Sequence, residues 1–127
     1  MATKKFVAIT EKEIYTELHK ILLCLKLNHY RTKSFAAHSA LGRIYDAINN
    51  LADSITEKLI GYSDVYPDQF NIGVIANEGL KSLSMKMINL GNQIEEYADE
   101  KGYIDIENLA QELSGEGAQL SYLANLS

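Results

Sequence analysis

The 127-residue sequence contains one cysteine, one proline and no tryptophan. A single cysteine excludes an intrachain disulfide framework and the paired-cysteine motifs of zinc sites and thiol redox enzymes. Cys24 lies in the apolar run 21–25, where we expect a buried structural thiol rather than a nucleophile. No stretch approaches the ~18 apolar residues of a membrane span, and the N-terminus lacks the apolar region of a signal peptide. The sequence therefore predicts a cytoplasmic protein that does not enter a membrane.

The sequence also has no excess of positive charge: its net charge is −5 at pH 7. This value gives no global case for nucleic-acid binding. The charge is nevertheless uneven: cations outnumber acids in residues 1–33, and acids outnumber cations in the remainder. Such asymmetry indicates either a basic contact surface or, more simply, a solvated first helix.

Apolar residues recur at three- and four-residue spacing in four segments, and no alternating pattern predicts a strand. The predicted helices cover residues 11 to 28–30, 35–60, 74–101 and a last segment that Asp105 caps and whose apolar stripe ends at Leu123. Thr10 with Glu13 forms a capping box before the first helix, and Ser34 is the N-cap of the second. Gly61 and Gly102 end the second and third helices. Gly115 and Gly117 predict a kink or a close helix approach in the fourth.

These elements predict a single all-α domain over residues 1–127, with residues 1–9 as a short N-terminal arm. The connection at 61–72 is the longest and holds the only proline. Its extended reach of about 40 Å is just enough to cross a helix of about 26 residues. We therefore expect a ferritin-like four-helix bundle in which the second and third helices run parallel.

The stretch from His29 to Glu57 carries the residues best suited to bind a metal. Asp53 and Glu57 are four residues apart and share one helix face, and His38 precedes Asp53 by fifteen residues on the same predicted helix. That separation is about 22 Å along a helix axis, so one chain cannot bring His38 to Asp53. Two copies packed antiparallel about a two-fold axis could. The simpler alternatives are that His29 and His38 cap helix ends and that the two carboxylates form a solvated face.

Residues 27–61 resemble the signature of the Dps family, the miniature ferritins of bacteria. His29 and Tyr30 match the histidine-aromatic pair that ends the first helix of that family. His38 matches its second histidine, and Asp53 and Glu57 match its Asp-x-x-x-Glu pair in both spacings. The segment HYRTKSFAAHSAL is more similar still to short Dps-like proteins encoded by bacteriophages.

The resemblance implies that His29 and His38 bind iron together with Asp53 and Glu57 of a symmetry mate. It implies a ferroxidase that oxidises Fe(II) with peroxide or oxygen, at a mononuclear or di-iron site open to other divalent metals. It further implies a homo-oligomer paired through the helix at 35–60, a dodecameric shell that stores iron, and a location in a bacterial or phage-infected cytoplasm or in a virion. DNA binding in the family often relies on a lysine-rich tail, of which Lys4 and Lys5 are the only counterpart.

The sequence departs from the family at the centre of this motif. Gly42 stands where the family usually has an aspartate, and Asp46, one turn later, is the alternative ligand. His29 and His38 are nine residues apart rather than about twelve, and Tyr30 replaces the preferred tryptophan. A second hypothesis is therefore a non-catalytic structural or interaction protein, such as a virion component, that keeps the bundle and the pairing without an active site.

Overall fold

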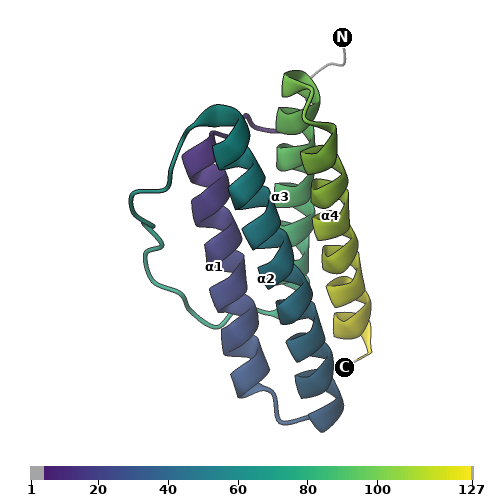
Figure 1. Ribbon diagram of the computed structural model, residues 1–127. Helices are drawn as coiled ribbons and strands as arrows, with labels where there is room; N and C mark the ends of the chain where they lie inside the picture. The colour runs from purple at the N-terminus through teal and green to yellow at the C-terminus, as the bar shows by residue number, and fades with distance from the viewer. Residues whose placement is uncertain (1–4, 127) are drawn as a thin grey trace.

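Four helices make up most of the chain, and the computed structural model describes residues 5–126. The helices are α1 (Glu11–Arg31), α2 (Phe35–Ser63), α3 (Leu80–Lys101) and α4 (Ile104–Asn125). Figure 1 shows α1 and α4 running in one direction and α2 and α3 in the other. Contacts join α1 to α2, α3 to α4, α2 to α4 and α1 to α3, so each helix packs against antiparallel neighbours. The described part of the chain is an all-α four-helix bundle.

The predicted starts of the first two helices are confirmed. The Glu13 amide donates to Thr10 Oγ1 over 3.3 Å, and the Thr10 amide donates to Glu13 Oε1 over 3.0 Å, which completes the capping box. The hydroxyl of Ser34 accepts from the Ala37 amide over 3.2 Å at the start of α2. Side-chain oxygens thus satisfy amides that have no partner within the helix.

The predicted end of α2 at Gly61 is wrong. The helix continues to Ser63 and ends at Asp64, which adopts the left-handed conformation with φ 59°. The Tyr62 ring stacks on Tyr103 with centroids 4.0 Å apart, and the Tyr62 hydroxyl donates to Asp105 Oδ1 over 2.8 Å. These contacts with a distant segment stabilise an additional helical turn, so Gly61 lies inside the helix.

The third helix begins later and the fourth earlier than the pattern predicts. Val74, the predicted start of the third helix, is 93% exposed and not helical, and α3 begins after Gly79. Asp105 is not the N-cap of α4, because the helix begins at Ile104 and Asp105 lies in its first turn. Gly102 does end α3, with φ 77°, as predicted.

Residues 64–79 connect α2 to α3 and pass beside α1 from one end of the bundle to the other (Figure 1). The Tyr15 hydroxyl donates to the carbonyl of Val65 over 2.8 Å. Further along, Lys12 pairs with Asp68 over 3.2 Å. These contacts attach the connection to α1 at two points, while most of its residues remain exposed to solvent.

The predicted apolar stripes form the core. They bury residues from all four helices: Ile14, Leu18, Leu25, Leu41, Ile44, Ile48, Ile55, Leu59, Leu83, Met87, Ile94, Ile106, Leu113 and Leu120. The close approach predicted around the glycines of α4 is confirmed at Gly117, where an added Cβ would lie 2.9 Å from Ile88 Cγ1. Gly91 on α3 is equally confined, because its Cβ would meet the Ala110 carbonyl at 2.9 Å. Glycine on both helices lets α3 and α4 pack closely.

Candidate metal centre

His29 and His38 face each other across the turn between α1 and α2. Their imidazole rings are stacked, with centroids 3.8 Å apart and an interplanar angle of 22°. His29 Nδ1 lies 2.9 Å from the His38 carbonyl oxygen, and His38 Nδ1 lies 2.9 Å from the His29 carbonyl oxygen. A carbonyl only accepts, so each Nδ1 must carry the proton and donate. The pair therefore ties the last turn of α1 to the first turn of α2.

The same two hydrogen bonds decide which nitrogen can bind a metal. With the proton on Nδ1, the neutral imidazole presents an unprotonated Nε2. Neither Nε2 has a hydrogen-bond partner among residues 5–126. Metal-binding histidines commonly donate their other N–H to a backbone carbonyl, which fixes the ring and its tautomer. The turn thus holds both rings in place and leaves the Nε2 atom of each without a hydrogen-bond partner within residues 5–126.

Gly42 provides the space that the His29 ring occupies. A Cβ added at Gly42 would lie 3.1 Å from His29 Cε1 and 3.6 Å from His29 Nδ1. An aspartate at this position, as in the Dps family, would meet the imidazole. The short turn at 32–34 brings the His29 ring over the face of α2, and Gly42 leaves the space that this ring needs. A short turn of this kind therefore requires a small residue at position 42.

The candidate carboxylates lie elsewhere on α2. Asp46, Asp53 and Glu57 are exposed. Since His38 and Asp53 belong to one continuous helix, their separation is about 22 Å along the axis, as predicted. Within residues 5–126, no group of three or more histidine, cysteine, aspartate or glutamate side chains could hold a metal ion. One chain therefore supplies only the two imidazoles at this site.

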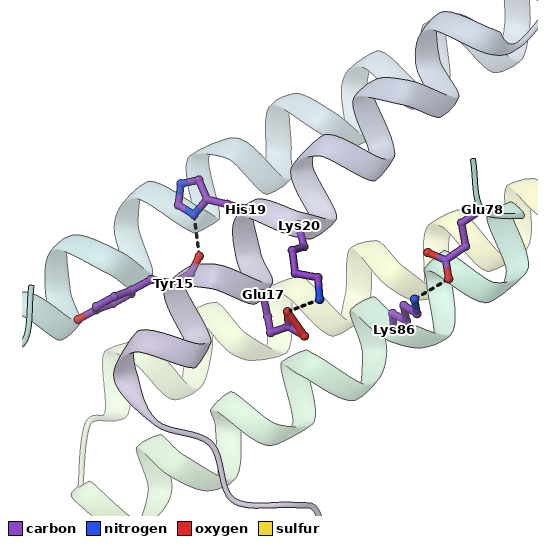
Figure 2. Close-up of polar contacts among 6 residues, drawn as sticks. All are labelled: Tyr15, Glu17, His19, Lys20, Glu78 and Lys86. Carbon is purple, nitrogen blue, oxygen red and sulfur yellow. Dashed lines mark hydrogen bonds and ion pairs between the residues drawn. The ribbon is translucent and has the colours of Figure 1, made fainter. Parts of the chain in front are cut away.

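The third histidine has a structural position. His19 Nδ1 donates to the Tyr15 carbonyl over 2.7 Å, as Figure 2 shows, and its ring stacks on Phe70 with centroids 4.2 Å apart. Phe70 belongs to the connection at 64–79, so His19 holds that segment against α1. No spacing in the sequence indicates this contact, because the two rings are 51 residues apart.

Charged pairs border the groove between α1 and α3 (Figure 2). Lys20 pairs with Glu17 over 3.2 Å, and Lys86 pairs with Glu78 over 2.6 Å. Cys24 lines the same groove and is half-buried, and burial raises the pKa of its thiol above the ordinary value. A raised pKa disfavours the reactive thiolate, but the prediction of a buried thiol is wrong, because Cys24 is only half-buried.

The N-terminal arm is docked on α3 where the structure describes it. Lys4 lies outside the described residues. The amide of Lys5 donates to Glu96 Oε1 over 2.6 Å, and the amide of Phe6 donates to Glu96 Oε2 over 3.0 Å. Lys5 is exposed, and the Glu96 carboxylate at its amide lowers the local positive potential that DNA binding needs.

Comparison with known proteins places the chain in a family without assigning a reaction. Residues 29–123 match DUF5856, described as a family of unknown function. The chain belongs to this family. No curated protein and no solved structure matches it. The matched segment begins at His29, so the histidine pair and the candidate carboxylates lie within it. None of the helices in the described residues is long and apolar enough to cross a membrane.

Proposed function

We propose that this DUF5856 protein is a Dps-like, ferritin-like subunit that binds and oxidises Fe(II) at a site completed by a second copy of the chain. The observation that carries the proposal is the reciprocal hydrogen bonding of His29 and His38, which leaves both Nε2 atoms free to bind a metal. Imidazole and carboxylate ligands together suit iron, and Asp53 and Glu57 are exposed carboxylates without a role in the fold of their own chain.

A second copy is required by the length of α2. If two α2 helices packed antiparallel about a two-fold axis, the histidine end of one would lie opposite the carboxylate segment of the other. Two equivalent sites would then form in each dimer. The parallel arrangement of α2 and α3 and the long connection between them also support a ferritin-like bundle.

In this assembly each side chain has a defined task. The imidazoles donate neutral nitrogen lone pairs, and the carboxylates of Asp53 and Glu57 compensate the charge of the cation, more strongly once it becomes Fe(III). Each Fe(II) gives up one electron. Hydrogen peroxide accepts two electrons and two protons to form two molecules of water, so two ferrous ions are consumed for each peroxide.

The direct test removes the carboxylates without changing their shape. Asp53→Asn/Glu57→Gln should slow Fe(II) oxidation at least about tenfold, because changing even the groups that only orient metal ligands costs about 10–100-fold. The matched control is Asp99→Asn/Glu112→Gln, which neutralises two exposed acids on α3 and α4 and should leave the rate unchanged. Ferric absorbance after anaerobic Fe(II) loading and addition of peroxide measures the rate. Equal rates in both double variants, or a wild-type rate no faster than buffer, would contradict the proposal.

Complementation tests whether the two halves come from different chains. A His29→Ala/His38→Ala chain and an Asp53→Asn/Glu57→Gln chain should each be inactive alone. After the two are unfolded and refolded together, mixed dimers contain one intact site and one that lacks all four ligands. Recovery of part of the wild-type rate supports the intersubunit site. No recovery, with mixed dimers confirmed by mass spectrometry, rules it out.

Gly42 favours a second candidate function, a non-catalytic structural or interaction protein. No carboxylate of the same chain stands beside the histidine pair, because the His29 ring fills the space over Gly42. In that case the histidines serve only as the cap of the turn. Light scattering would then give the same oligomer mass, and thermal denaturation the same stability, with and without added Fe(II) or Co(II).

A further inference from the structure

A cavity of about 700 Å³ opens at the end of the bundle where α1 meets α2, and it shares no residue with the histidine pair or the carboxylates. Residues from α1, α2, α4 and the segment that leads into α3 line it. Its volume lies within the range of roughly 300–1,000 Å³ that is typical of small-molecule sites. The cavity lies over the end of the core, because buried Leu41 and the partly buried Leu80 and Leu123 line it.

The wall of the cavity is mainly apolar. Leu41 is buried at its inner side, and Leu80, Leu123 and Leu126 contribute side chains from the start of α3 and the end of α4. Ala36 and Ala37 on the first turn of α2 leave the mouth open, because their side chains are short. An apolar chain placed here would exclude water from leucine surface that is otherwise wet.

Arg31 gives the cavity its charge. It is the only charged side chain among the lining residues, and no described residue forms an ion pair or hydrogen bond with its guanidinium. Among residues 5–126, no carboxylate side chain lines the cavity. The first turn of α2 carries no acidic residue, but the C-terminal ends of α1 and α4 line the same cavity, so the helix dipoles oppose one another and Arg31 sets the charge.

We propose that this cavity binds a soluble single-chain amphiphile with a carboxylate head group, such as a medium-chain fatty acid. The alkyl chain lies against Leu41, Leu80 and Leu123, and the carboxylate accepts hydrogen bonds from Arg31. The guanidinium fork matches a carboxylate in geometry, and its lack of an internal partner leaves that capacity unused. Arg31 repels the head group of a cationic amphiphile. A polar anion without an alkyl chain leaves the leucine side chains exposed to water.

The test is calorimetric titration of the full chain with dodecanoate below its micelle concentration. We expect saturable binding of dodecanoate and none of dodecyltrimethylammonium, which has the same chain and the opposite charge. Arg31→Glu should weaken dodecanoate binding at least tenfold. Lys33→Glu makes the same charge change two residues away, on a side chain that does not line the cavity, and should leave the affinity within about twofold.

A second variant tests the apolar wall of the cavity by placing a large side chain at its mouth. Ala36→Phe places a ring at the mouth from an exposed position, so the fold should persist by circular dichroism while dodecanoate binding is lost. Absence of binding to the wild type, or equal losses in Arg31→Glu and Lys33→Glu, would overturn the proposal. So would binding to phosphatidylglycerol vesicles without binding of monomeric dodecanoate, because that result identifies a membrane surface. These readouts contain no iron and are independent of the ferroxidase tests.

Discussion

Three tyrosines close the end of the bundle where α2 and α3 finish, whereas two histidines and an open cavity occupy the end where α1 meets α2. At the closed end, Tyr62 stacks on Tyr103, and the Tyr97 ring lies 6.3 Å from Tyr103. The hydroxyl of Tyr97 donates to the carboxylate of Glu11, which ties α3 to the start of α1. At this end the polar tips of Tyr62 and Tyr97 have partners within the chain.

The open end is built from groups that lack such partners. The two Nε2 atoms of the histidine pair and the guanidinium of Arg31 have no hydrogen-bond partner among the described residues, and the Phe35 ring is 83% exposed. Unused hydrogen-bonding and apolar groups contribute little to folding but are available to a ligand or a second chain. The comparison predicts that the closed end contributes more to the stability of the fold, and the function we propose is placed at the open end.

The largest expected effect concerns aromatic rings at the two ends. Tyr103→Ala removes the stacking with Tyr62 and the contact with Tyr97, and should lower the free energy of unfolding by about 2–4 kcal/mol. Phe35→Ala removes a ring of similar size from the open end and should change it by less than about 0.5 kcal/mol. Chemical denaturation measures both. Similar losses in the two variants would remove the distinction between the ends.

A smaller effect should appear at alkaline pH. Partial burial and then the Glu11 carboxylate raise the pKa of Tyr97 above its ordinary value of 10.0. The folded state therefore favours the neutral phenol, and this stabilisation is complete below about pH 10 and is lost as the pH rises further. Tyr97→Phe should cost about 1 kcal/mol at neutral pH and make the alkaline decline shallower. Tyr15, whose pKa burial also raises, should retain part of that decline. An unchanged profile of unfolding free energy against pH would contradict this role.

The smallest effect compares two glycines within α2. At Gly61 nothing lies within 4 Å of an added Cβ, so Gly61→Ala should stabilise the protein by about 0.5–1 kcal/mol through helix propensity. At Gly42 the methyl group must displace the His29 ring, so Gly42→Ala should gain less and weaken Co(II) binding. Denaturation and the visible absorbance of bound Co(II) report the two properties. Equal gains with unchanged Co(II) binding would show that the ring does not rest on Gly42.

The sequence predicts the local features of this fold and misses those made by distant residues. Heptad-like spacing and the oxygens of Thr10 and Ser34 act within a single helix, so the core stripes and both helix starts could be predicted. The end of α2 could not, because Tyr62 is held by residues about forty positions later, and helix-ending signals do not include such contacts. Likewise, the histidines were found from spacing, but their reciprocal hydrogen bonds depend on the conformation of the turn at 32–34.

The connection at 64–79 sets an asymmetric limit on how this architecture can change. Lengthening it costs little, since each doubling of a flexible loop adds only about 0.6 kcal/mol of closure entropy. Shortening it is different: a link of about eight residues reaches at most about 29 Å, which is less than the roughly 33 Å axis of α3. With so short a link, α3 could not begin at the opposite end of the bundle and run parallel to α2. Insertions in this segment should therefore be tolerated in relatives, and large deletions should not.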